Sequence, residues 1–205
     1  GLAFFYQELG FRKKSRRMAE HALSLSRDPG VSLFVTCRTE IMAFNNILHH
    51  YRDLQECALT IRARIPEILL SGDHEYSAQA MTDAYYLLYH AGRPLGPLIT
   101  EGRKNHEILE NLAVSSIAEQ HRIYHQVIEN LAHADPDRLA QLVGPYYVED
   151  SEHSRRVRLQ DHTSYYDYHS TTAFSYYLSD KPLEAYHRAT KLSLSSKGME
   201  GTPAP

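Results

Sequence analysis

The sequence predicts an all-α chain of helix hairpins, and three observations support this fold class. Apolar residues recur at spacings of three and four, with no sustained alternating run of strand type. Glycine and proline gather where helices would end, at 29–30, 72–73, 92–94, 135–136, 144–145 and 180–182. The turns at Gly10, His50, Gly92 and Asp180 are separated by 40, 42 and 88 residues, and 88 is twice 44. We therefore expect about ten helices, in hairpins that recur every 40 to 44 residues.

Five hairpins are expected in chain order, at 1–29, 31–71, 73–112, 113–144 and 152–197. In the first, Tyr6 precedes the turn at Gly10, and Ala19 and Ala22 lie on the returning helix. The second hairpin turns near His50 without a glycine, and the third turns at Gly92. The fourth has a long helix ending near residue 133 and a short one from 135–136. The polar residues 145–161 are expected to form a surface loop and the start of a long helix.

The last hairpin, residues 172–191, shows the pattern most clearly. Tyr176 and Tyr177 lie on its first helix, and Pro182 sits in the first turn of its second helix, where the missing N–H group costs nothing. Ala185 and Ala189 are four residues apart and would let the two backbones approach closely.

The order of Leu, Ala, Tyr, Gly, Ala, Ala and Pro in residues 2–29 resembles a tetratricopeptide repeat. That resemblance implies a right-handed superhelical array of antiparallel hairpins. Because the front of the first helix is missing from the pattern, we expect the chain to begin inside a repeat and to be a fragment of a larger protein. A period of 40 to 44 exceeds the ~34 residues of the standard repeat, so extended helices are expected.

A wider resemblance covers residues 84–203. The runs YYLLYHAGRPLGPLI, EQHRIYHQVIENLAHADPDRLAQLVG and AFSYYLSDKPLEAYHRATKL are similar to the helical region after the ATPase module in large bacterial sensors. Those sensors combine a serine/threonine kinase, a nucleotide-binding ATPase and a histidine kinase. The resemblance implies a non-enzymatic arm for regulation or protein contact, and it brings no catalytic residue.

Composition indicates a globular chain and limits its partners. The 205 residues are 42% apolar and 23% charged, with a net charge of −3, and a single domain over 1–205 is expected. No apolar run approaches the ~18 to 20 residues of a membrane span. The start lacks the layout of a signal peptide, and two cysteines suggest no disulfide framework, so we expect a cytoplasmic location without membrane contact.

A near-neutral charge balance argues against a nucleic-acid partner, for which a domain pI above ~9 is expected. A local basic cluster is the exception, and it is interpreted as an exposed helix face; its members are Arg12, Lys13, Lys14, Arg16 and Arg17.

The search for chemistry finds no catalytic motif. The sequence has no phosphate-binding loop, dinucleotide fingerprint, nucleophile elbow or HExxH zinc motif. His121 and His125 are four apart on one helix face, yet a metal site needs further ligands, so an exposed or core-edge pair is favoured and no metal or cofactor is predicted. Cys57 is interpreted as a small buried residue rather than a nucleophile.

The candidate binding residues are aromatic. Aligning the hairpins by their turns places aromatic residues six and three positions before the turn, at Phe4, Phe44, Tyr86, Phe174, Tyr89 and Tyr177. In tetratricopeptide arrays these positions face the concave groove, where an aromatic stripe could hold a peptide or a partner helix. The alternative, which we favour, is that a tightly wound array buries them.

Three functions from different classes remain open. The first is a regulatory or scaffold arm of a signalling protein, in contact with flanking domains, another copy or a signalling partner. The second is a ligand-sensing arm that holds a small molecule inside the superhelix. The third, a metal-dependent helical enzyme, is the least favoured because no ligand set supports it.

Overall fold

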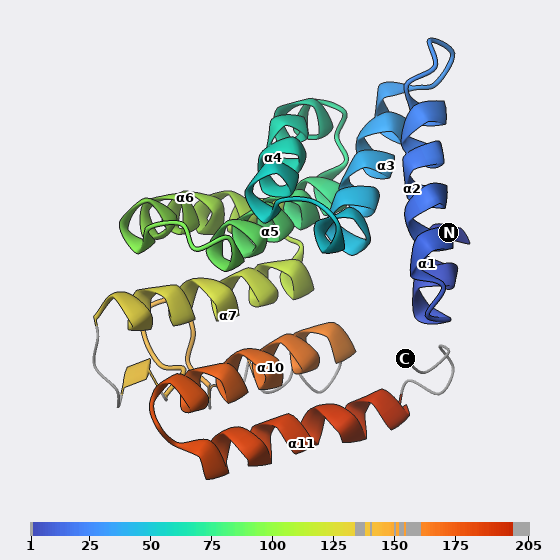
Figure 1. Ribbon diagram of the computed structural model, residues 1–205. Helices are drawn as coiled ribbons and strands as arrows, with labels where there is room; N and C mark the ends of the chain where they lie inside the picture. Colours follow the sequence, from blue (N-terminus) through green and yellow to red (C-terminus); the bar gives the residue numbers. More distant parts are fainter. Residues whose placement is uncertain are drawn as a thin grey trace. The chain divides into compact units, whose positions relative to one another are not determined.

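The computed structural model describes residues 2–133, 138–139, 141–149, 151, 154 and 161–198. Nine α-helices and one short 3₁₀ helix make up this part of the chain (Figure 1). They are α1 (Leu2–Glu8), α2 (Arg12–Ser26), α3 (Leu33–Asn46), the 3₁₀ helix η1 (Leu48–His50), α4 (Leu54–Leu70), α5 (His74–His90), α6 (Leu95–Leu112), α7 (Ser115–Ala132), α10 (His162–Leu178) and α11 (Pro182–Gly198). Strand-type pairing in the described residues is limited to one isolated bridge between Val143 and Val148. The predicted all-α class is confirmed.

Local chemistry explains most helix ends. Asp53 and Asp73 cap α4 and α5 by accepting hydrogen bonds from the N–H groups of Glu56 and Tyr76. Glycines follow α1, α4 and α5 with positive φ, which glycine adopts without steric cost; they are Gly10, Gly72 and Gly92. The glycine-free turn expected near His50 is occupied by η1. The short helix expected from 135–136 lies outside the described residues.

Not every glycine and proline ends a helix. Pro66 lies inside α4, and Gly102 lies inside α6 and is buried. In the sequence analysis, glycine and proline are interpreted as markers of the ends of helices. Gly102 is buried between α6 and its neighbours, where packing can offset the weak helix propensity of glycine, whereas Pro66 is exposed.

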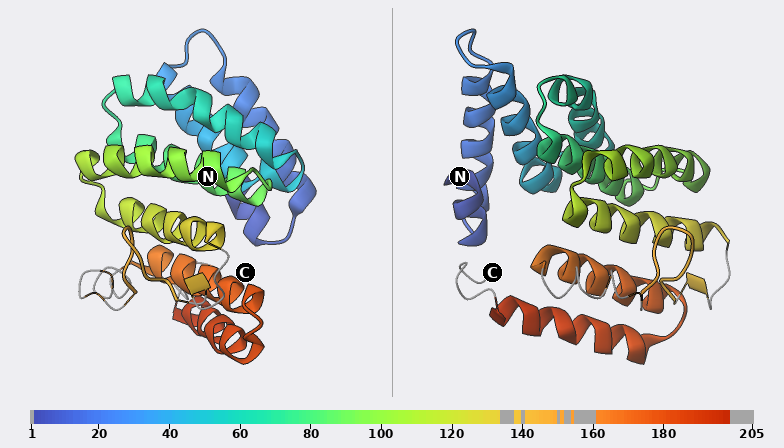
Figure 2. Two further views of the ribbon diagram at one scale, coloured as in Figure 1. Left: turned by 90° about the vertical axis from the view of Figure 1, so that its left-hand side faces the viewer. Right: turned by 180° about the vertical axis from the view of Figure 1, so that it is seen from behind.

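The chain divides into two compact units, of which unit 1 runs to Arg93 and unit 2 begins at Pro94. In unit 1, α1 packs on α2, α2 on α3, α3 on α4 and α4 on α5. In unit 2, α6 packs on α7, α7 on α10 and α10 on α11, and the last pair lies side by side in both views of Figure 2. The boundary falls between the two helices of the hairpin expected at 73–112, and the single domain expected for 1–205 stays a prediction.

The segment after α7 is more buried than its polar sequence suggested. Leu142 and Tyr147 are 1% and 2% exposed and form a core cluster with Val127 of α7 and Tyr168 of α10. The surface loop expected over 145–161 is therefore wrong at Tyr147. Its ring anchors the segment in the core of unit 2, where an aromatic side chain removes a large apolar area from water.

Candidate functional site

The aromatic residues predicted in unit 1 do not form an open stripe. Phe44 of α3 is 3% exposed and belongs to the core, so it has almost no surface to offer a partner. Tyr86 and Tyr89 of α5 are half-buried and pack against His90, with ring centroids 4.2 and 5.0 Å apart. Burial raises the pKa of Tyr89. Phe4 lies in α1, and its side chain lies outside the described residues.

The two candidates in unit 2 are on the surface. Phe174 is 46% exposed and Tyr177 is 68% exposed, although both are large and apolar. Further exposed apolar side chains follow them across the turn between α10 and α11. We call the exposed apolar side chains on the two helices beside this turn the α10–α11 patch; they are Phe174, Tyr177, Leu178, Leu183 and Tyr186. A concentration of exposed apolar side chains of this kind marks an interaction surface in many monomeric proteins.

These aromatic residues face outward because hydroxyl residues occupy the buried side of α10. Thr172 and Ser175 are 1% and 2% exposed, and their hydroxyls donate to the carbonyls of Tyr168 and Thr171 at 2.7 and 3.0 Å. A hydroxyl that bonds to its own helix is buried without losing a hydrogen bond. Small residues can therefore fill the α10–α11 contact and leave the bulky rings outside.

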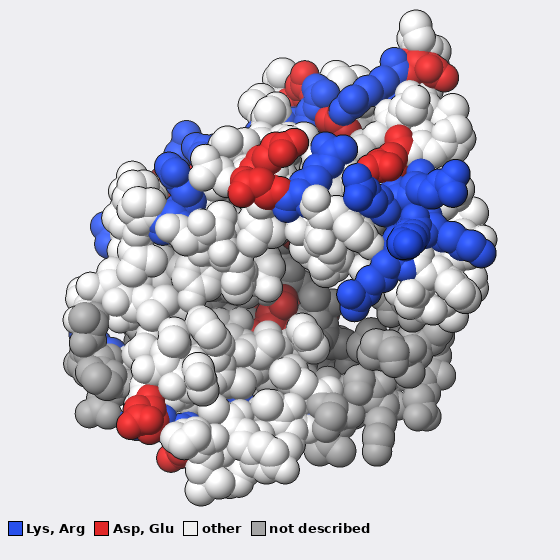
Figure 3. Space-filling model, in the orientation of Figure 1, with Lys and Arg blue, Asp and Glu red and all other residues white. Residues whose placement is uncertain are grey.

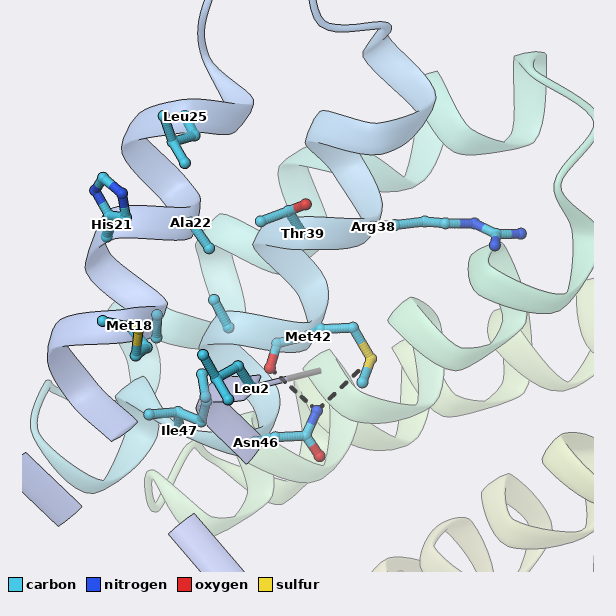
Figure 4. A pocket seen from close by; sticks show the side chains of 13 residues that line it. Leu2, Met18, His21, Ala22, Leu25, Arg38, Thr39, Met42, Asn46 and Ile47 are labelled. Atoms are coloured by element: carbon cyan, nitrogen blue, oxygen red, sulfur yellow. Dashed lines mark hydrogen bonds between the residues drawn. The ribbon is translucent and has the colours of Figure 1, made fainter. Parts of the chain in front are cut away.

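Unit 1 holds an apolar groove that the aromatic alignment did not indicate. It has a volume of about 430 Å³ and lies between α1, α2 and α3 (Figure 4). We call it the α1–α3 groove; its lining includes Leu2, Met18, Ala19, His21, Ala22, Leu25, Arg38, Thr39, Met42, Ala43, Asn46 and Ile47. Ala19 and Ala43 form a buried floor, whereas Leu25 and Met42 remain 51% and 41% exposed on the two sides.

The charged residues of this lining are already engaged. Arg38 forms an ion pair with Asp73 at 2.7 Å, and its guanidinium lies about 4 Å from the ring centres of Phe34 and Tyr76. None of the lining residues that the structure describes is acidic. The groove can therefore recognise apolar shape, and it holds no acid–base pair that would supply chemistry.

The histidine pair on α7 is buried rather than exposed. His121 and His125 are both 0% exposed, which corrects the expectation of a surface or core-edge pair. His121 Nε2 lies 3.0 Å from the carbonyl oxygen of Gly102 in α6. Burial lowers the pKa values of the two histidines to about 3 and about 4. Both imidazoles are therefore neutral at pH 7.

No group of three or more histidine, cysteine, aspartate or glutamate side chains that could hold a metal ion occurs among the described residues. Cys37 and Cys57 are free and buried. The interpretation of Cys57 as a small core residue is confirmed, because its side chain is 0% exposed and burial raises its pKa.

Polar side chains fasten the segment 141–149 to unit 2. Gln126 of α7 accepts hydrogen bonds from the backbone N–H groups of Tyr146 and Tyr147 at 3.1 and 3.3 Å. Asn130 donates to the carbonyls of Arg138 and Gln141. These amides satisfy loop groups that would otherwise be buried without partners, which is a structural role.

The C-terminal helix is tied to the same segment. Arg188 of α11 donates to Glu149 at 2.6 Å and to the Tyr168 hydroxyl at 2.5 Å. The arrangement is a partly buried ion pair with a bound hydroxyl, which fixes α11 against α10.

Basic side chains gather over α1 and α2 in the view of Figure 3. Arg16 forms an exposed ion pair with Glu20 at 2.9 Å, and the ammonium of Lys14 lies over the rings of Tyr6 and Phe11. The prediction of an exposed helix face for residues 12–17 agrees with this placement, except that Ser15 between them is fully buried.

The chain matches no protein-family model, and comparison with curated proteins and with solved structures likewise gives no match. Both resemblances, to the tetratricopeptide repeat and to the helical arm of bacterial sensors, therefore stay predictions. In the part of the chain that the structure describes, no helix is long and apolar enough to cross a membrane.

Sequence reasoning missed the α1–α3 groove and the outer half of the α10–α11 patch. The periodic spacing of Met18, Ala22 and Leu25 was a signal for an apolar face on α2. A sequence does not show which apolar face lacks a neighbour. The alignment of the hairpins compares only positions before each turn, so it does not include Leu183 and Tyr186.

Proposed function

We propose that this chain is a non-enzymatic helical-repeat arm that regulates or scaffolds a cytoplasmic signal-transduction protein by binding other protein elements. In this proposal its hairpins form a right-handed, tetratricopeptide-like superhelical array. The partners are flanking domains of the same polypeptide, another copy of the chain, or a signalling partner. Neither nucleic acid nor a membrane takes part.

The α10–α11 patch is the observation that carries this proposal. Tyr177, Leu183 and Tyr186 are 68%, 63% and 65% exposed, and each leaves a large apolar area in water. Burying that area against a partner would be favourable by roughly 25 cal/mol per Å². Tyrosine also supplies contact area with little loss of side-chain entropy, which is one reason for its enrichment at binding hot spots.

The absence of convergent acid, base or metal ligands around the described surfaces supports a binding role over an enzymatic one. Two free, buried cysteines agree with a reducing compartment.

The test uses matched tyrosine variants on one helix. Tyr177→Ala removes a patch residue, whereas Tyr166→Ala removes a ring that is 52% exposed on α10 outside the patch. Both should leave the melting temperature nearly unchanged, because neither ring is in the core. Only Tyr177→Ala should weaken association, measured by titration against the other domains of the signalling polypeptide and by sedimentation velocity for self-association. Equal loss in both variants, or none in either, would refute the patch as the binding surface.

A further inference from the structure

Residues 141–149 form a short hairpin beside α7 and α10, which we call the strap (Figure 1). Two backbone hydrogen bonds pair its sides in antiparallel register. The N–H of Gly144 donates to the carbonyl of Tyr147 at 2.8 Å, and the N–H of Glu149 donates to the carbonyl of Leu142 at 3.1 Å. Because the two sides are paired, the turn and the end of the strap move together.

The turn of the strap is held by side chains of α6 and α7. The Tyr146 ring packs against His106 of α6 and His125 of α7, with ring centroids 5.2 and 4.2 Å apart. The backbone N–H of Tyr146 donates to Oε1 of Gln126 at 3.1 Å. These contacts fix the turn on the two helices that begin unit 2.

The end of the strap is held by a different pair of helices. Oε1 of Glu149 accepts a hydrogen bond from Nη2 of Arg188 in α11 at 2.6 Å, and another from the hydroxyl of Tyr168 in α10. A charge-assisted hydrogen bond of the first kind is about twice as strong as a neutral one. The side chains of Glu149 and Arg188 are 17% and 19% exposed, so solvent ions screen this pair less than a surface pair.

Little else holds α11 in place. Among its described side chains, at 182–192, only Ala185 is buried, and an alanine removes little apolar area from water. The helix packs chiefly on α10. A helix with so few buried apolar contacts belongs to the low-stability part of a structure. The ion pair of Arg188 with the strap is therefore a large part of what keeps α11 docked.

We propose that the strap is a coupling element that controls whether α11 is docked on α10. With Tyr146 in place against α6 and α7, Glu149 holds Arg188 and α11 stays docked. When Tyr146 leaves that place, the strap tilts, Glu149 moves away from Arg188, and α11 undocks together with Leu183 and Tyr186 of the α10–α11 patch. The resulting regulation of the patch rests on the proposed function, whereas the docking of α11 does not.

A small movement of the strap is sufficient. Leu142 and Tyr147 are buried in the core of unit 2, so the strap tilts about them without leaving the unit. The bond between Glu149 and Arg188 is 2.6 Å long, and a shift of about 1 Å would lengthen it beyond hydrogen-bond distance.

Hydrogen exchange of the full chain at pH 7 measures the docking of α11 without a partner. Tyr146→Ala removes the ring at the turn of the strap, and Tyr146→Phe is the conservative variant that keeps it. Arg188→Met removes the ion pair directly and shows the exchange of a released α11. Val143→Ala is the matched control, because it shortens a side chain of the same strap that is 50% exposed.

Tyr146→Ala and Arg188→Met should each raise the exchange rate of α11 amides about tenfold or more, because each breaks the charge-assisted link between the strap and α11. The amides of α7 should keep their protection, which shows that unit 2 is still folded. Tyr146→Phe and Val143→Ala should leave α11 as it is in the unmodified chain.

The double variant of Tyr146→Ala with Arg188→Met tests transmission through the strap. Its α11 should exchange no faster than in Arg188→Met alone, because the link is already broken. Unchanged α11 exchange in Tyr146→Ala, or additive effects in the double variant, would overturn the proposal. Equal loss of protection in α7 and α11 would also overturn it, since the strap would then stabilise unit 2 as a whole. No partner is present, so a failure here is distinct from a failure of the Tyr177→Ala test.

Discussion

Asp167 of α10 is a half-buried carboxyl group whose charge opposes folding at neutral pH because it is desolvated. Desolvation raises its pKa from 3.8 to about 6, against the hydrogen bond that the Tyr124 hydroxyl donates to Oδ1 at 2.7 Å. The folded state therefore holds more protons than the unfolded state between about pH 4 and pH 6. The contribution of Asp167 to stability falls as the pH rises through that window.

Asp167→Asn keeps an acceptor for Tyr124 and removes the charge. It should raise the free energy of unfolding at pH 7 by on the order of 1 to 3 kcal/mol and leave it nearly unchanged near pH 4. Urea unfolding at both pH values measures this difference. Asp28→Asn, at an exposed position, is the control and should change neither value. An equal gain at both pH values would contradict the assignment.

Gly144 is a residue that the packing, rather than the backbone, requires. A Cβ atom there would lie 2.2 Å from Nε2 of Gln126, whose oxygen holds the N–H groups of Tyr146 and Tyr147. Gly144→Ala should destabilise the chain by roughly 1 to 3 kcal/mol, because the amide must leave its place. In the double variant with Gln126→Ala, the cost of Gly144→Ala should largely vanish. A thermodynamic cycle on urea midpoints measures the coupling, and strict additivity would show that the two side chains do not compete.

At the scale of elements, the contact between α10 and α11 offers a matched pair of alanines. Ala185 is 9% exposed, but Ala189, which was expected at the same crossing, is exposed. Ala189 is exposed because the neighbouring Arg188 points inward, toward Glu149 and Tyr168. Ala185→Leu should therefore lower stability by roughly 1 to 3 kcal/mol through overpacking, and Ala189→Leu should change it little. The melting temperatures of the two variants test this placement. Equal melting temperatures would show that Ala185 and Ala189 do not differ in burial.

Helix existence and position could be predicted from the sequence, whereas the direction in which side chains face could not. The ends of α1, α4 and α5 carry the expected glycines, and the helix period was clear throughout. On α10, the hydroxyls of Thr172 and Ser175 bond to carbonyls of their own helix, so these two polar residues are buried while Phe174 and Tyr177 are exposed. A hydrophobicity pattern would instead place Thr172 and Ser175 at the surface and Phe174 and Tyr177 in the core.

At the scale of the whole molecule, the two units differ in the buried groups that acid would charge. The most strongly lowered histidine pKa values, about 3 and about 4, belong to His121 and His125 in unit 2. Their unfolded forms take up protons below about pH 6.5. The stability that their neutral forms provide is therefore complete above that pH and is lost as the pH falls toward 4. Protonation of Asp167 stabilises the folded state as the pH falls. This single protonation offsets only part of the destabilisation that comes from the two histidines.

We expect unit 2 to lose roughly 2 to 3 kcal/mol of stability between pH 7 and pH 5. Hydrogen exchange, corrected for the intrinsic effect of pH, should show α7 losing more protection over this range than α4 and α5, although burial also lowers the pKa values of His49 and His90 in unit 1. The double variant His121→Gln with His125→Gln should remove most of the pH dependence, since a glutamine amide can still donate to the Gly102 carbonyl that His121 Nε2 approaches. If the variant and the unmodified chain lost protection in parallel, some other group would have to be the one that acid charges in unit 2.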